Sequence, residues 1–132
     1  MGVLEDYAVA VWIELPDRRV LLVRDPKRPP PVYWKCPGGR SLPEESAEQA
    51  AIREAQEETG IIIDQTILEL VYTEPRGNHS FVFFRASVPT LTGLKSRGDE
   101  GELVKAFTRA HIAGLPDFFS AHRRIAQRAK LL

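Results

Sequence analysis

The chain has 132 residues, of which 27% are charged, and its 18 basic residues balance its 18 acidic ones. This balance excludes a net charge that would draw the chain to nucleic acid or to a membrane surface. The single cysteine, Cys36, excludes an internal disulfide. No apolar run approaches the roughly 20 residues that span a bilayer, and the start has no signal-peptide pattern. These totals predict a single domain over residues 1–132, located in the cytoplasm.

Two apolar runs open the chain, YAVAVWIEL at 7–15 and RVLLVR at 19–24. The short Pro-Asp-Arg connection between them predicts a β-hairpin, with Trp12 in the core. Arg24 ends the second run, and two roles stay open for it: binding a substrate phosphate, or a surface ion pair. A proline-rich loop is expected at 25–32, because prolines cannot donate to a β-ladder. A short strand is expected at 33–36, with Cys36 as a small buried side chain.

Residues 37–61 read PGGRSLPEESAEQAAIREAQEETGI and predict a glycine loop followed by a helix. Ser46 and Gln49 have the spacing of a capping box at the helix start. Gly60 stands where helices commonly end in a left-handed residue. Small apolar residues on the helix predict that one face lies close against a sheet.

Strands are expected at 61–63, 67–72, 80–86 and 103–108, separated by a turn at 64–66 and by loops at 75–78 and 90–101. The apolar strand 80–86 has two readings, core or an edge that pairs with a second subunit, so a homodimer stays open. Pro116 and Asp117 are expected to open a final helix. Together these elements predict an α/β chain of the α+β type, with a mixed sheet rather than an alternating doubly wound one.

Three glutamates of the central helix, Glu54, Glu57 and Glu58, stand at i, i+3 and i+4 and therefore leave it on one face. Like charges at this spacing repel by roughly 0.2–0.5 kcal/mol per pair. The face is therefore either simply solvated or built to hold a cation. Carboxylate oxygens suit Mg²⁺ or Mn²⁺ better than zinc.

The pattern from Gly39 through Glu45 to the run REAQEETGI at 53–61 resembles the Nudix box, G-x5-E-x7-R-E-U-x-E-E-x-G-U, where U is aliphatic. All of the fixed positions are filled. Ala55 is small for its aliphatic position, and Glu44 stands where many members of the family have glycine. The box covers residues 39–61, and the flanking strands extend the resemblance over the chain.

The resemblance implies the Nudix fold, a mixed and curved β-sheet between helices. It also implies an Mg²⁺- or Mn²⁺-dependent hydrolase that cleaves a pyrophosphate linkage in a nucleoside diphosphate linked to another group, or in a triphosphate. The implied metal ligands are the Gly38 carbonyl, Glu54, Glu57 and Glu58. The implied catalytic residues are Glu57, Glu54, Arg53 and Glu102, with Glu45 and Gly39 as supports behind the ligands. Arg24, Arg40 and Arg76 are predicted to bind substrate.

The substrate stays open within the class of nucleotide pyrophosphates. Pro75 follows Gly60 by fifteen residues, a spacing that resembles enzymes acting on ADP-ribose. Oxidised nucleoside triphosphates, nucleotide sugars and RNA 5′ ends are alternatives. Two other classes of function are also considered: a non-catalytic sensor of a nucleotide metabolite, and an interaction domain whose acidic residues are only a solvated helix face.

Overall fold

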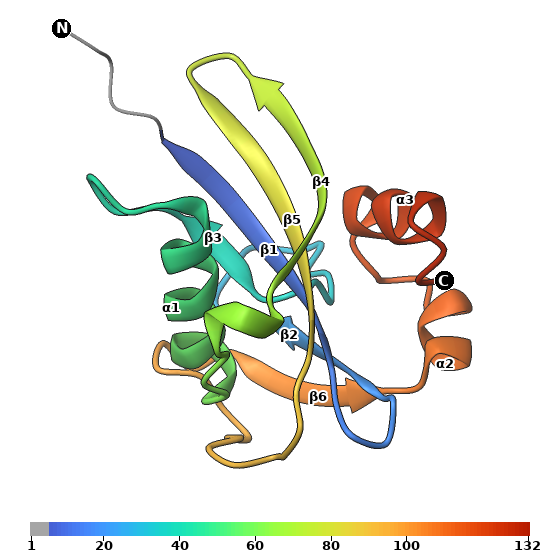
Figure 1. Ribbon diagram of the computed structural model, residues 1–132. Helices are drawn as coiled ribbons and strands as arrows, with labels where there is room; N and C mark the ends of the chain where they lie inside the picture. Colours follow the sequence, from blue (N-terminus) through green and yellow to red (C-terminus); the bar gives the residue numbers. More distant parts are fainter. Residues whose placement is uncertain (1–5) are drawn as a thin grey trace, which may run out of the picture.

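The computed structural model describes residues 6–132, which form a six-stranded sheet with helices on both sides (Figure 1). The strands are β1 (Tyr7–Glu14), β2 (Val20–Arg24), β3 (Gly38–Arg40), β4 (Glu69–Arg76), β5 (His79–Ser87) and β6 (Leu103–Phe107). The helices are α1 (Ala47–Thr59), α2 (Arg109–Ala113) and α3 (Ser120–Arg128), with a 3-10 turn at Gln65–Ile67.

The sheet is mixed, as the sequence predicts. Its strands follow the order β4-β5-β1-β2-β6, and β3 pairs with β1 beside this path. β1 runs parallel to β5 but antiparallel to β2 and β3. The predicted hairpin of β1 and β2 is therefore confirmed, and a parallel neighbour gives the sheet its mixed character.

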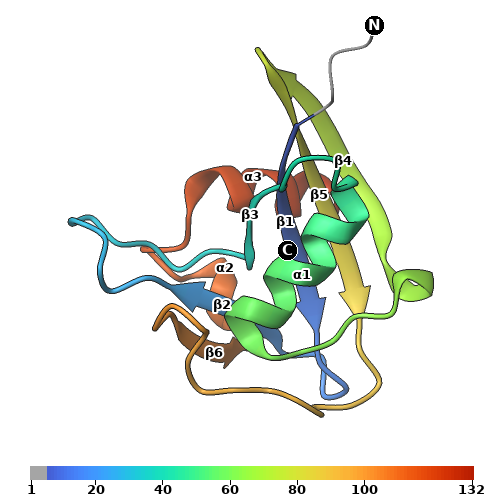
Figure 2. The same cartoon turned by 90° about the vertical axis from the view of Figure 1, so that its left-hand side faces the viewer.

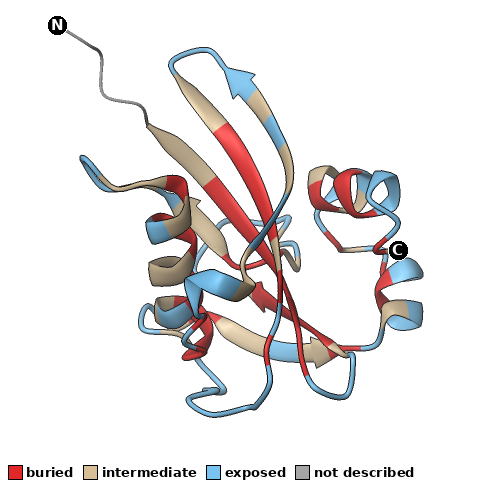
Figure 3. Ribbon diagram, in the orientation of Figure 1, coloured by how far each residue is buried: buried red, intermediate tan, exposed pale blue. Residues whose placement is uncertain are grey.

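The two sides of the sheet bury different kinds of side chain. Figure 2 shows α1 crossing one face of the sheet, with α2 and α3 behind it. Alternate residues of a strand point to opposite faces, so Val9 and Val11 of β1 pack toward the alanines of α1, whereas Trp12 packs toward Ile125 of α3. Trp12 is completely buried, as expected. Figure 3 shows buried residues running along the centre of the sheet and along the helix faces that cover it.

Helix α1 begins and ends as its sequence predicts. The Ser46 side chain accepts a hydrogen bond from the Gln49 backbone N–H at 3.0 Å, and the Gln49 side chain accepts one from the Ser46 N–H at 2.9 Å. This reciprocal pair satisfies two of the backbone donors that every helix start leaves free. Gly60 ends the helix in the left-handed region, with φ of 83°. Local interactions therefore fix both ends of α1, independently of its contacts with the sheet.

Four boundary predictions are wrong. The strand expected at 33–36 is reduced to bridges from Trp34 and Lys35, and the regular strand lies at β3 instead. Residues 61–63 pair in no ladder. β4 continues into the loop expected at 75–78 as far as Arg76. The final helix begins at Ser120, not at Pro116, and α2 was not predicted at all. Extended chain becomes a strand only when a partner lies beside it, which local sequence does not report.

No helix within residues 6–132 is both long enough and apolar enough to cross a membrane.

Candidate active site

Gly38 and Gly39 of β3 let this strand approach both β1 and α1 closely. A Cβ on Gly38 would lie 2.0 Å from the carbonyl oxygen of Val9, so only glycine fits beside β1 at this point. A Cβ on Gly39 would lie 2.7–3.0 Å from the carboxylate group of Glu54. The Gly38 N–H also donates to Glu58 Oε2 at 2.7 Å. The start of β3 is therefore pressed directly against the acidic face of α1.

A polar pocket of about 210 Å³ lies at this junction. We call it the acidic pocket, because it is lined by Asp25 and by six further carboxylate side chains: Glu54, Glu57, Glu58, Asp99, Glu100 and Glu102. The first three come from one face of α1, as their spacing predicts. The other three come from the loop that precedes β6, more than forty residues further along the chain.

Arg53 joins the acidic side chains of the box to one another. Its guanidinium group donates to Glu45 at 2.9 Å, to Glu54 at 2.9 Å and to Glu57 at 3.2 Å. It also donates to the carbonyl oxygen of Arg40 at 3.0 Å. The hydrogen bonds from Arg53 hold the pKa of Glu45 below its usual range. One cation thus offsets part of the repulsion that the i, i+3, i+4 spacing creates.

Glu58 is the most deeply buried carboxylate of the pocket, with 6% of its surface exposed. Burial raises its pKa to about 8, and the Lys35 ammonium and the Gly38 N–H only partly oppose this effect. Burial also raises the pKa of Glu54, although Arg53 opposes it. A buried carboxylate that lacks enough compensating positive charge is costly to ionise. Glu58 and Glu54 therefore provide oxygen donors in a place that favours an added cation.

The loop before β6 is attached to the end of α1 through backbone contacts that the sequence did not predict. Lys95 N–H donates to the carbonyl oxygen of Thr59 at 2.9 Å, and Asp99 N–H donates to that of Glu57 at 2.8 Å. A Cβ on Gly98 would lie 2.7 Å from the Glu58 carbonyl oxygen and 2.3 Å from Glu102 Oε1. These contacts bring Glu102 to the pocket with 8% of its surface exposed. In the sequence, only the glycines of this loop could have indicated these contacts, because glycine permits the close approach of another backbone.

Within residues 6–132, no three His, Cys, Asp or Glu side chains converge into a ready-made metal-binding cluster. Of the predicted ligands, Glu54 and Glu57 accept hydrogen bonds from Arg53, and Glu58 accepts one from the Gly38 N–H. The donor set nevertheless fits a hard divalent cation, because it consists of carboxylate oxygens and includes the electrostatically unsatisfied Glu58. The metal-binding roles of the Gly38 carbonyl, Glu54, Glu57 and Glu58 stay predictions.

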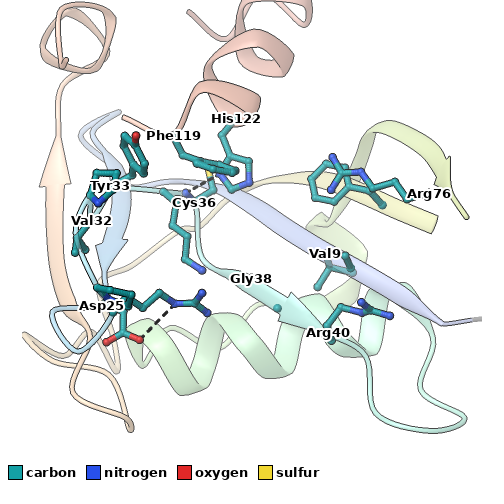
Figure 4. Close-up of a pocket in the computed structure, with 17 residues that line it drawn as sticks. Val9, Asp25, Val32, Tyr33, Cys36, Gly38, Arg40, Arg76, Phe119 and His122 are labelled. Atoms are coloured by element: carbon teal, nitrogen blue, oxygen red, sulfur yellow. Dashed lines mark hydrogen bonds and ion pairs between the residues drawn. The ribbon is translucent and has the colours of Figure 1, made fainter. Parts of the chain in front are cut away.

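A second, larger pocket of about 450 Å³ adjoins the acidic pocket. We call it the aromatic pocket, because Tyr33, Phe81, Phe119 and His122 contribute to its lining. Figure 4 shows Tyr33, Phe119 and His122 gathered at one end, with Arg76 and Arg40 toward the other. His122 is buried and its Nδ1 accepts a hydrogen bond from the Cys36 N–H at 3.1 Å. Cys36 is fully buried and burial raises its thiol pKa, in agreement with a packing role.

The three arginines predicted to bind substrate lie in different settings. Arg40 and Arg76 line the aromatic pocket, where Arg40 pairs with Asp6 and Arg76 pairs with Glu74. Arg24 pairs with Asp117, and its guanidinium lies 4.8 Å from the centre of the Trp34 ring. The ion pair that we considered as the alternative for Arg24 is thus present. Contact of any of the three with a substrate stays a prediction.

Comparisons with known proteins agree with the box and the fold. The model of the NUDIX domain family matches residues 5–129. Two Bacillus subtilis (strain 168) proteins are similar in sequence: "Uncharacterized Nudix hydrolase YvcI", 36% identical over 66% of this chain, and "Putative 8-oxo-dGTP diphosphatase", 38% identical over 64%. The matched stretches span only 57% and 53% of these relatives' own lengths.

Among solved structures, a MutT structure from work on the Aliivibrio salmonicida and Vibrio cholerae proteins superposes with a TM-score of 0.74. The match covers 95% of this chain and 96% of that one at 24% sequence identity, which supports the fold alone. The fold therefore agrees with the family match, which runs through the box, both pockets and nearly all of the described residues. The chain belongs to the NUDIX family.

Proposed function

We propose that the protein is a Mg²⁺-dependent hydrolase that cleaves a pyrophosphate linkage in a nucleotide. The observation that carries the proposal is the acidic pocket, in which box carboxylates and loop carboxylates surround one polar space beside a larger aromatic pocket. A nucleoside diphosphate linked to another group, or a nucleoside triphosphate, has the matching chemistry: a flat apolar base joined to a phosphate chain. The family's general use of divalent cations supports the choice of metal.

Within this proposal, Glu54, Glu57, Glu58 and the Gly38 carbonyl would hold the cation, with Glu57 as its central ligand. When bound, the cation would neutralise charge on the phosphate chain and help to activate the attacking water. Arg53 keeps its three glutamate partners oriented through the hydrogen bonds described above. Glu57 borders the acidic pocket and its side chain is 46% exposed, so a cation can reach its carboxylate from solvent.

The proposed reaction is a substitution at phosphorus. The oxygen of a water molecule forms a bond to one phosphorus atom, and the bond from that phosphorus to the bridging oxygen breaks. The leaving phosphate keeps the electron pair of the broken bond. A proton of the water passes to a carboxylate, for which Glu54 and Glu102 are the two candidates because both line the acidic pocket and are largely buried.

The test is product release from a panel of nucleotides, with and without Mg²⁺. The panel includes 8-oxo-dGTP, suggested by the name of one relative, unmodified triphosphates, ADP-ribose, nucleotide sugars, dinucleoside polyphosphates and a short RNA with a 5′ triphosphate. Turnover of one member should require the metal and should fall by about 10²-fold or more in Glu57→Gln. Glu48→Gln is the matched control, because Glu48 lies on the same helix but does not line the acidic pocket.

The outcomes separate the alternatives. Metal-dependent turnover that survives in Glu57→Gln would contradict the assigned role of the box. Metal-assisted binding of one nucleotide without any turnover would favour the sensor. If neither turnover nor a rise in thermal stability with Mg²⁺ is seen, the acidic face is only solvated and the proposal is wrong.

A further inference from the structure

The two pockets are not separate, because they share one stretch of lining. Lys35, Gly38 and Gly39, together with Asp25 and Arg28 of the proline-rich loop, border both. The shared residues mark where a ligand would pass from the aromatic pocket to the acidic pocket. A molecule that occupies both must therefore run past these side chains.

Lys35 differs from the other basic side chains that line the two pockets. Arg28 pairs with Asp25 at 3.7 Å, Arg76 pairs with Glu74 at 2.8 Å, and Arg40 pairs with Asp6. Within residues 6–132, the Lys35 ammonium group is in no ion pair or hydrogen bond with another side chain. Within the described residues, the Lys35 ammonium group thus has carboxylates nearby but no close side-chain partner that would have to be displaced by a ligand.

The backbone of Lys35 is nevertheless fixed. Its N–H donates to the carbonyl oxygen of Val23 at 2.9 Å, and its own carbonyl oxygen accepts from the Val23 N–H at 2.9 Å. The next residue on either side is held as well, since Trp34 bonds to the segment before α3 and Cys36 donates to His122. Only the flexible part of the Lys35 side chain can move, which suits a group that meets a ligand.

The charge of Lys35 acts on both pockets. On the acidic side, burial raises the pKa of Glu58 to about 8, and the Lys35 ammonium opposes that rise. On the aromatic side, burial lowers the pKa of His122 to about 3, and the Lys35 charge adds to that fall. The ammonium group is therefore within electrostatic reach of side chains at the two ends of the joined site.

The aromatic pocket offers exposed ring surface at its opening. Tyr33 is 41% exposed and Phe119 is 37% exposed, and their ring centres are 6.1 Å apart with a tilt of 52°. Large aromatic side chains left accessible at a pocket commonly mark a binding surface, since burying them against a flat ligand is favourable. The joined site thus presents aromatic surface first, then the Lys35 ammonium group, then the carboxylates. This order matches the base, the first phosphate and the metal-bound phosphate of a nucleotide.

We propose that Lys35 binds a phosphate group of the substrate where the two pockets meet, with the nucleobase in the aromatic pocket against Tyr33 and Phe119. This inference rests on the proposed function for the identity of the ligand. It adds a substrate-binding residue and a direction to the site: the base lies toward α3, and the phosphate chain runs over Lys35 toward α1. Lysine binds phosphate as a point charge, so the site needs no fixed two-pronged geometry.

The test measures binding apart from hydrolysis. Binding of guanosine and adenosine, and of their 5′-monophosphates and 5′-diphosphates, is measured by calorimetry in EDTA for the wild-type protein, Lys35→Met and Lys35→Arg. A hydrogen bond to a charged group contributes roughly 1.5–3 kcal/mol, so Lys35→Met should weaken diphosphate binding by about 10–100-fold. Binding of the nucleosides should stay unchanged, and Lys35→Arg should recover most of the lost affinity.

Lys105→Met is the control, because Lys105 is exposed on β6 and lines neither pocket. Diphosphate binding that is equal in Lys35→Met and wild type would overturn the proposal, as would an equal loss for nucleosides and diphosphates. Absence of phosphate-dependent binding in the wild-type protein would overturn it too. Because EDTA prevents metal-dependent turnover, a selective loss of diphosphate binding supports Lys35 even if the nucleotide panel shows no hydrolysis.

Discussion

Glu58 of the acidic pocket and His122 of the aromatic pocket are both deeply buried titratable side chains, and the chain stabilises them to different degrees. Glu58 and His122 are each 6% exposed, and burial favours the neutral form of both. The neutral ring of His122 is held by the chain itself: its Nδ1 accepts the Cys36 N–H, and three phenylalanine rings pack against it. Glu58 accepts one hydrogen bond from the Gly38 N–H and shares its pocket with six other carboxylates.

The difference separates residues that stabilise the fold from residues that await a ligand. The Nδ1 atom of His122 has a partner within the chain and its ring packs against Phe83, so substitutions of these two buried side chains should act mainly on stability. Around Glu58, the chain supplies too little positive charge, so this region should respond mainly through metal binding and activity. Sites that bind and react commonly keep such unfavourable electrostatics. Three substitutions would break or sharpen this contrast.

The largest effect on stability is expected for Phe83→Ala, on the aromatic side. Phe83 is completely buried on β5, and its ring meets His122 edge-on at 5.8 Å between centres. Truncation of a buried phenylalanine removes apolar contact and leaves a cavity, which costs about 3–5 kcal/mol. Urea denaturation should show this loss in the free energy of unfolding. Phe83→Leu is the milder control, and a loss below about 1 kcal/mol in Phe83→Ala would mean that this region contributes little to stability.

The same contrast explains how much of the molecule the sequence could predict. The α1 half of the site was predictable, because Ser46, Gln49, Gly60 and the spacing of the glutamates act within a few residues of one another. The segment at 33–36 was misassigned, because its bridge partners are Val23 in β2 and Phe118 before α3, which are distant in the sequence. The five-residue helix α2 is too short to give a clear periodic pattern.

The second half of the acidic pocket was predictable only in part. Glu102 was anticipated from the family resemblance, but the attachment of its loop to α1 was not. Asp99 and Lys95 meet α1 through backbone groups, so the identity of their side chains carries no record of those bonds. Gly98 is the exception, because its missing side chain is what the packing requires. The aromatic pocket was missed because its lining comes from segments far apart in the chain.

His122 should make stability depend on pH on the acid side of neutrality. Burial, with smaller effects from Lys35 and Arg76, lowers its pKa from 6.5 to about 3 in the folded protein. The unfolded chain therefore binds one more proton between these values, so folding stability falls as the pH drops below 6.5. The loss due to this group should be about 2 kcal/mol between pH 6.5 and about pH 4.5.

The measurement compares the wild-type protein with His122→Asn, by urea denaturation across this pH range. Asparagine does not titrate there, and its side-chain oxygen can accept the Cys36 N–H in place of Nδ1. Other carboxylates titrate in the same range in both proteins, so the difference between the two curves isolates His122. If the stability of both proteins depended on pH in the same way, His122 would take up its proton in the folded state. The packing around His122 would then be too loose to keep the ring neutral.

A change in stability of the opposite sign is expected for Glu58→Gln. In EDTA at about pH 8, glutamine carries no charge to desolvate, and its carbonyl oxygen can still accept the Gly38 N–H. The free energy of unfolding should therefore rise above that of the wild-type protein. The stabilisation that Mg²⁺ gives to the wild-type protein should shrink, because stabilisation by a bound ligand increases with the ligand's affinity for the folded state.

The sign is what makes this substitution informative. Removing the charge of a buried carboxylate that its own chain fully satisfies destabilises a protein, because the partner loses its hydrogen bond or ion pair. A gain in EDTA together with a loss of the Mg²⁺ response would instead show that Glu58 is held at a cost to the metal-free fold. Glu48→Gln should produce neither change, since Glu48 lies outside the acidic pocket. A loss of stability with an unchanged Mg²⁺ response would place Glu58 with His122, as a group whose role is structural, and would remove it from the metal site.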